Sequence, residues 1–257
     1  MRTPLGFLVP LLLAAATACL AEPPDQDDAP ATPLRQGPPV HSFGAMREVL
    51  RDGRTEARVA LEDVLSPDTV AVGATEGLAA EITIDRGAVH LAEVVREADP
   101  SLRSIGVRRD ATGERATLLI TAEVETWEPS PLSPVEDLAA LEDAVRAAAL
   151  AAGIDPAKPL PFRVEGTASA LQLHVLDHSC PIAHPEGPAP WRFDGQAVPV
   201  QLVGFYAEDA GGVLTHHGQR SHVHAVLPEE GVAGHVDAVR FEGMDVASAR
   251  LFLPALR

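Results

Sequence analysis

The sequence predicts an α+β fold with two subdomains, each built on a mixed, largely antiparallel β-sheet. Many short segments rich in Val, Ile, Thr and Leu are separated by turns containing Asp, Gly and Pro, which is typical of strands and hairpins. Only two stretches have helical periodicity. Hydrophobic residues make up 46% of the 257 residues but aromatic residues only 4%, so Val, Leu and Ala must form the core.

The first 21 residues resemble an export signal. Arg2 precedes an apolar run at 5–16, which is shorter than the roughly 20 residues that span a bilayer as a helix. Small residues before Cys19 resemble a bacterial lipobox, so we expect lipidation at Cys19 and a periplasmic or cell-surface lipoprotein. Signal-peptidase cleavage after Ala21 is the alternative. Either route leaves Cys180 without an intramolecular disulfide partner.

Residues 22–40 combine Pro with acidic residues and are expected to form an extended tether before a folded domain at 41–257. We expect its subdomains at about 41–155 and 156–257. The net charge is −17, from 20 Lys and Arg against 37 Asp and Glu, which excludes nucleic acid as an expected partner. Membrane contact is expected only through the lipid anchor.

Two helices are predicted along the folded part. The first covers 42–50, where apolar residues follow helical spacing, and stops at Gly53. The second has Ser133 as its N-cap, Pro134 as its first residue and Glu136 in a capping box, and ends at Gly153. Strands are predicted at 56–61, 69–74, 79–84, 87–92, 116–126, 161–166, 169–176, 198–206, 221–227, 234–241 and 247–253.

A histidine pattern near the C-terminus predicts a metal site. His222 and His224 are two residues apart in a predicted strand, so their side chains project to the same side. A turn at 228–231 would return the chain and bring His235 beside them. Three neutral imidazoles with an open fourth position are typical of a catalytic zinc site. The alternative is a set of strand histidines satisfied by hydrogen bonds.

These residues also resemble a known family. His222-Val-His224 and Gly234-His235-Val-Asp are similar to the H-x-H and G-H-V-x-D elements of the alpha-acetolactate decarboxylases, with the same interval between the second and third His. Gly204-Phe205-Tyr206 resembles the family's G-F-Y/W element, and the segment around Glu81 resembles its L-x-G-E hairpin. The resemblance covers about residues 43–253.

The resemblance implies a zinc-dependent lyase that decarboxylates 2-acetolactate, or a related 2-hydroxy-3-oxo acid, to an acetoin-type product and CO2. His222, His224 and His235 would hold zinc in a cleft between the subdomains, where the ion acts as a Lewis acid. Glu81 would approach the metal from the N-terminal subdomain and transfer a proton; an exposed hairpin Glu is the alternative. The expected partner is the small acid, and a homodimer is possible.

Two positions depart from the family. His174 falls where the family carries Arg, and as a cation it would replace that Arg in holding the substrate carboxylate; a buried structural His is the alternative. The family's second active-site Glu, in a C-terminal extension, has no counterpart before Arg257. These departures leave open a non-catalytic metal- or ligand-binding lipoprotein with the same fold and His triad.

Other polar residues are weaker site candidates. We expect His216 and His217 to lie in a loop at the mouth of the site. His178, Cys180 and His184 would together suit a soft metal, but no strand or helix register directs them toward one another.

Overall fold

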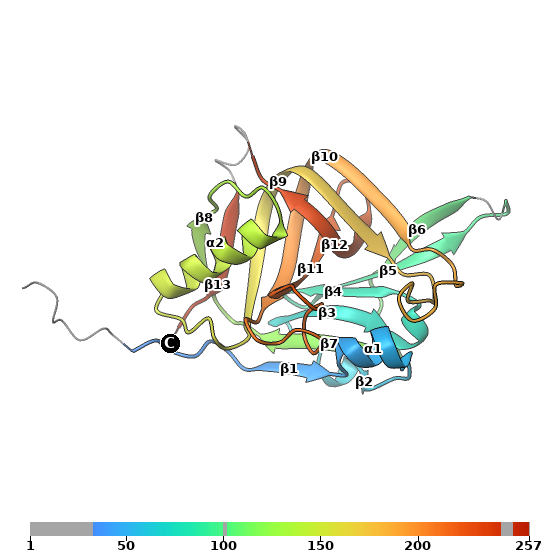
Figure 1. Cartoon of the computed structure of the whole chain (residues 1–257), viewed down its shortest axis with the longest axis horizontal. Coiled ribbons are helices and arrows are strands. Elements are labelled where there is room, and N and C mark those ends of the chain that lie inside the picture. The colour runs from blue at the N-terminus through green and yellow to red at the C-terminus, as the bar shows by residue number, and fades with distance from the viewer. Residues whose placement is uncertain (1–32, 100–101, 243–248, 257) are drawn as a thin grey trace, which may run out of the picture. The chain divides into compact units, whose positions relative to one another are not determined.

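The computed structural model describes residues 33–99, 102–242 and 249–256. The expected export signal, Cys19 and the first part of the tether lie outside these residues. Within the described part, Pro33–Leu256, two β-sheets and two α-helices form one unit (Figure 1). Every pair of named strands is antiparallel, which confirms the expected α+β class with largely antiparallel sheets.

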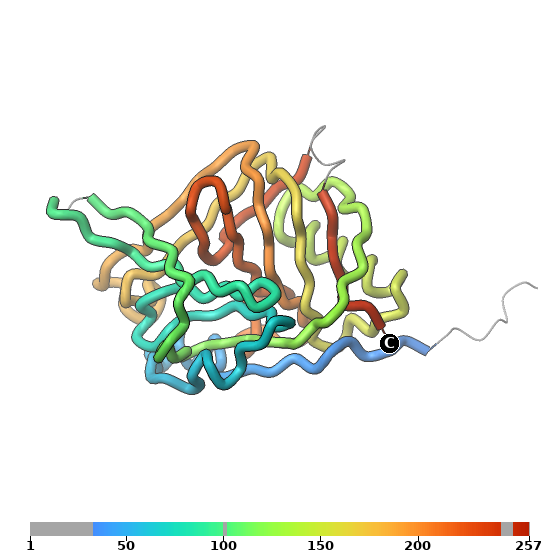
Figure 2. Tube along the Cα trace, turned by 180° about the vertical axis from the view of Figure 1, so that it is seen from behind, coloured from blue at the N-terminus to red at the C-terminus, as the bar shows by residue number. Residues whose placement is uncertain are grey.

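The first sheet has seven strands in the order β1-β7-β3-β4-β5-β6, with β2 paired to β7. In Figure 2 the far end of the β5–β6 hairpin projects beyond the other strands of this sheet. The strands are β1 (Val40–Phe43), β2 (Val59–Ala60), β3 (Thr69–Thr75), β4 (Glu81–Asp85), β5 (Ala88–Arg96), β6 (Arg103–Arg108) and β7 (Arg115–Glu123). Helix α1 (Met46–Asp52) lies beside β7, and the 3-10 turns η1 (Leu61–Asp63) and η2 (Glu76–Leu78) connect strands.

The second sheet has six strands in the order β10-β11-β12-β9-β13-β8. Because β9 also pairs with β10, the pairings of β9, β10, β11 and β12 close a cycle. The strands are β8 (Trp127–Pro131), β9 (Leu160–Val175), β10 (Trp191–Tyr206), β11 (Ser221–Leu227), β12 (Val232–Arg240) and β13 (Arg250–Pro254). Helix α2 (Leu138–Ala151) covers this sheet by burying Leu141, Val145 and Ala149 in its core.

Both predicted helices form, but each begins later than expected. Residues 40–43 pair with β7 as strand β1, and α1 starts at Met46 and ends at Gly53, whose φ of 62° suits glycine. The expected capping box at Ser133 and Glu136 is wrong. Asp137 caps α2 instead, because its carboxylate accepts the backbone N–H of Ala140 at 2.8 Å.

Three strand predictions also need correction. The segments 161–166 and 169–176 form one 16-residue strand, β9, in which Gly166 allows close packing on Ala249 rather than a turn. Strands β6 and β8 were not expected. Since β8 and α2 both belong with the second sheet, sheet membership changes between Glu123 and Trp127 rather than near residue 155.

The last part of the expected tether is attached to the domain. The Arg35 N–H donates to the Gly153 carbonyl at 2.8 Å, and the Asp155 N–H donates to the Arg35 carbonyl at 2.9 Å. These contacts hold Arg35 beside the end of α2, within the range where the sequence predicts a tether.

Among the described residues, no helix has the length and apolar character needed to cross a membrane.

The two sheets contact each other through an apolar cluster and through polar contacts. Val70, Val72 and Ile120 of the first sheet pack against Val203 and Phe205 of β10. Beside this cluster, the side chains of Glu81, Thr83 and Asp85 on β4 all face the second sheet, because alternate residues of a strand project to the same side. The polar space between the sheets is therefore formed around β4, β11 and β12.

Candidate metal centre

Three histidines of the β11–β12 hairpin converge between the sheets. His222 and His224 share one face of β11, and His235 is the direct cross-strand partner of His224. One ring nitrogen from each lies within 4.8 Å of the others. All three side chains are buried. The structure thus confirms the geometric prediction that the three imidazoles meet at one point.

Hydrogen bonds at Nδ1 orient two of these histidines. The His222 Nδ1–H donates to the Leu214 carbonyl at 3.2 Å. The His224 Nδ1 lies 3.1 Å from Thr83 Oγ1 on the first sheet, and the backbone of Ile82 also bonds this ring. With Nδ1 bonded in each ring, Nε2 is the nitrogen left to bind a metal. The two Nε2 atoms are 3.2 Å apart.

The donor set fits a tetrahedral divalent ion. Zn–N bonds of about 2.0–2.1 Å at tetrahedral angles place two imidazole nitrogens roughly 3.3 Å apart, close to the separation found here. Burial lowers the pKa of His222 to about 3, an effect that a protonated His216 would increase. Burial also holds the pKa of His224 and His235 well below the usual value. All three imidazoles are therefore neutral at physiological pH, which is the form that binds metal.

Glu81 approaches the triad from the opposite sheet. Its Oε2 lies 3.8 Å from His224 Nε2, and its Oε1 accepts the Leu176 N–H at 3.4 Å. The side chain is only 5% exposed, so it is not the exposed hairpin residue of the alternative interpretation. Burial raises the pKa of Glu81 to about 7, although the positive charge of His174 opposes this shift. Glu81 can therefore exchange a proton near neutral pH.

His174 lies beside the triad on the neighbouring strand. It is the cross-strand partner of His235, and the two ring centroids are 4.9 Å apart. Its Nδ1 is 2.8 Å from Asp237 Oδ1, and Arg192 donates to Asp237 Oδ2 at 2.6 Å. Burial would lower the pKa of His174, but the hydrogen bond to Asp237 and the charge of Glu81 outweigh it and raise the pKa. His174 is thus an imidazole that its surroundings favour as a cation.

A cavity of about 360 Å³ opens onto these groups. Glu81, His174, His222 and His235 are among its polar lining residues. The loop between β10 and β11 closes one side through His216, whose ring lies 5.3 Å from that of His235, and through His217. Both residues therefore lie in a loop at the site, as the sequence predicts, and neither belongs to the group that could hold a metal.

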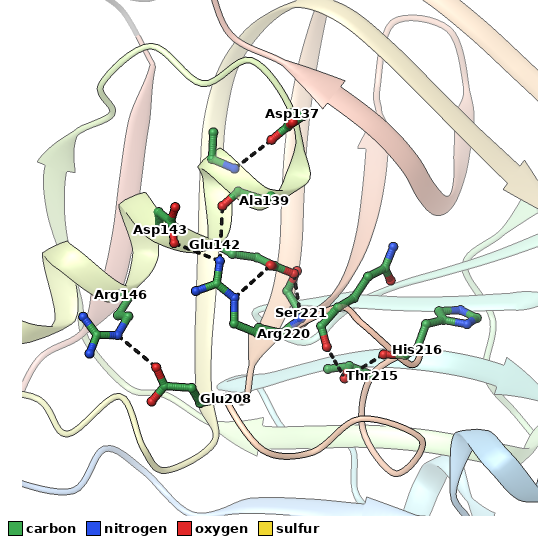
Figure 3. Close-up of polar contacts among 12 residues, drawn as sticks. Asp137, Ala139, Glu142, Asp143, Arg146, Glu208, Thr215, His216, Arg220 and Ser221 are labelled. Atoms are coloured by element: carbon green, nitrogen blue, oxygen red, sulfur yellow. Dashed lines mark hydrogen bonds and ion pairs between the residues drawn. The ribbon is translucent and has the colours of Figure 1, made fainter.

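A polar network anchors this loop to α2, as Figure 3 shows. Glu142 accepts the backbone N–H of Arg220 at 2.8 Å and the hydroxyl of Ser221 at 2.8 Å. The Thr215 hydroxyl donates to the Gln219 carbonyl at 2.8 Å within the loop. These contacts fix the start of β11, and with it the position of His222.

Solved structures with a similar fold are known. No family model and no curated protein matches the sequence. The structure is similar to alpha-acetolactate decarboxylase from Bacillus subtilis strain 168, with a TM-score of 0.61 at 14% identity over 85% of each chain. The chain has the acetolactate decarboxylase fold.

Two further structures agree with this result. The acetolactate decarboxylase from Bacillus subtilis subspecies spizizenii has a TM-score of 0.59 at 13% identity, covering 85% of this chain and 86% of that one. A Staphylococcus aureus protein, described as of unknown function and similar to alpha-acetolactate decarboxylase, has a TM-score of 0.58 at 11% identity over 83% and 84%. At these identities the likeness concerns the acetolactate decarboxylase fold.

Some contacts of the site have no local signal in the sequence. Thr83, the Leu214 carbonyl and Asp237 contact the histidines only because distant segments pack together. Asp237 alone carries a hint, since it lies two residues after His235 in the predicted strand, although the pairing of β12 with β9 has a register shift there. In contrast, His178, Cys180 and His184 do not form a metal-binding group among the described residues, where only the triad does.

Proposed function

We propose that the chain is a metal-dependent decarboxylase of 2-acetolactate or a related 2-hydroxy-3-oxo acid. The convergence of three buried, neutral imidazoles, of which His222 and His235 line the cavity, carries the proposal. The acetolactate decarboxylase fold supports it. A divalent ion such as zinc, held by His222, His224 and His235, would act as a Lewis acid toward the keto and hydroxyl oxygens of the substrate.

The surrounding residues suit the remaining steps. His174 is held toward its cationic form by Asp237 and lines the cavity, so it is placed to bind the substrate carboxylate. When the bond to the carboxylate carbon breaks, its electron pair stays on the substrate and CO2 leaves. Protonated Glu81 supplies the proton to the substrate carbon that had carried the carboxylate, and the product is an acetoin-type hydroxyketone.

The test is acetoin release by the zinc-loaded folded domain. Racemic 2-acetolactate is incubated with the protein, and acetoin is measured above the spontaneous background. We expect His224→Ala to lose both the bound zinc and acetoin formation. His184→Ala is the matched control, because this side chain is 55% exposed and does not line the cavity.

Zinc content separates the two functions that the site allows. One zinc per chain without acetoin formation would refute the decarboxylase and favour the non-catalytic metal- or ligand-binding protein. Equal zinc loss in His224→Ala and His184→Ala would refute the metal centre itself.

A further inference from the structure

The cavity beside the histidines has both polar and apolar lining residues. Beyond the polar groups, its wall consists of apolar side chains from α1, from the segment after β9 and from the first sheet: Met46, Val49, Leu50, Leu118, Leu176 and Ile182. We propose that this wall binds an alkyl substituent of the substrate that is several carbons long. The inference rests on the proposed function, which accounts for the polar part of the substrate, and adds the kind of substituent that the substrate carries.

The volume of the cavity exceeds what a small acid needs. About 360 Å³ corresponds to roughly twelve water molecules at about 30 Å³ each, and pockets of about 300 Å³ and above commonly hold drug-sized ligands. The side groups of 2-acetolactate are methyls, so this acid would leave much of the apolar wall in contact with water. A longer alkyl group removes that contact and gains its hydrophobic free energy.

The apolar wall is built to stay in place. The backbone N–H groups of Met46 and Arg47 donate to the carbonyls of Val213 and Gly212 at 2.9 and 2.8 Å. These bonds join α1 to the loop that carries His216. The wall and the metal-binding end of the cavity are therefore held in fixed relation, as binding one extended ligand requires.

The exposure of Ile182 also indicates a ligand. Its side chain lines the cavity and is 65% exposed, the highest value among the large hydrophobic residues described. It is absent from the apolar core clusters, and Leu50 beside the same cavity is only half-buried. An alkyl chain extending from the metal centre toward the solvent would cover both side chains.

The test separates binding from catalysis by using n-alkyl hydroxamates, which chelate zinc through two oxygens. The dissociation constant of the zinc-loaded protein is measured by calorimetry from acetohydroxamate to octanohydroxamate. We expect the constant to fall by about fourfold for each methylene group that is buried. Dissociation constants independent of chain length would overturn the inference.

Two variants locate the alkyl group. Leu50→Asn and Ile182→Asn are partly exposed positions, so folding should tolerate them, and both should reduce the gain per methylene. Leu150→Asn is the matched control, since Leu150 is 39% exposed on α2 and does not line the cavity. An undiminished gain in both cavity variants, or an equal reduction in the control, would refute the assigned position.

The kinetic measurement distinguishes the two proposals. If 2-hydroxy-3-oxo acids with longer alkyl groups are decarboxylated with higher kcat/KM than 2-acetolactate, both proposals stand. Chain-length-dependent binding without decarboxylation of any member refutes the decarboxylase alone. Acetolactate decarboxylation together with a flat hydroxamate series refutes the alkyl site alone.

Discussion

Thr83→Val should weaken metal binding without removing any metal ligand. The substitution replaces a hydroxyl by a methyl group of similar size, so the packing between the sheets is retained. It removes the 3.1 Å contact that orients His224 through Nδ1. Loss of such an outer contact typically lowers metal affinity by 10- to 100-fold. The backbone of Ile82 also bonds this ring, so we expect about tenfold, or about 1.4 kcal/mol.

The assay is a competitive zinc titration against a chromophoric chelator at fixed pH. Thr121→Val is the matched control, because Thr121 is also a buried threonine of the first sheet, and its hydroxyl donates to the Val70 carbonyl away from the histidines. The control should bind zinc like the unaltered chain. If both variants have the same zinc affinity, the contact does not orient His224 and the reasoning fails.

Three further predictions concern stability and location. Asp85→Ala should lower the free energy of unfolding by about 3 kcal/mol or more, because buried Arg163 loses a carboxylate that accepts two of its hydrogen bonds. Urea unfolding compares this variant with Asp143→Ala, which removes an exposed carboxylate. Equal losses of unfolding free energy in the two variants would contradict the prediction. Burial and the neighbouring Arg109 lower the pKa of His90 to about 4. The free energy of unfolding should therefore be unaffected by His90 above about pH 6.5 and should fall from there toward pH 4, because the unfolded chain takes up a proton that the folded chain does not. The melting temperature of His90→Gln should depend less on pH over this range, and a pH profile identical to that of the unaltered chain would refute the prediction. Cys19→Ala should move the protein from the membrane to the soluble periplasmic fraction, whereas unchanged fractionation would contradict a lipid anchor.

Local spacing was enough to predict that the side chains of His222, His224 and His235 converge. The alternation at His222 and His224 and the short turn before His235 determine the cross-strand pairing that the structure contains. Only the family resemblance predicts that Glu81 lies near the triad, since its proximity to His224 depends on how the two sheets pack. Thr83 was not identified for the same reason.

The sequence predicts a strand correctly where its local residue pattern agrees with its packing in the sheet. β8 was missed because it is a short edge strand with Pro129 and Pro131, residues that are rare inside sheets. The sequence predicts two strands, 161–166 and 169–176, where the structure has the single strand β9, and the missing side chain of Gly166 permits a close contact with Ala249. Pro129, Pro131 and Gly166 belong to residue types that usually interrupt a strand, but here the neighbouring strands pack around them and the strands continue.

The ligands and the groups around them come from different parts of the chain. One hairpin supplies all three imidazoles, whereas Glu81 and Thr83 belong to a strand that precedes it by more than a hundred residues. A hairpin of adjacent strands closes a short loop, which costs little entropy, so the ligands can assemble before the other sheet docks. Under the proposed function, the β11–β12 hairpin would hold the ion, and a substitution of Glu81 on β4 would change proton transfer without removing a metal ligand.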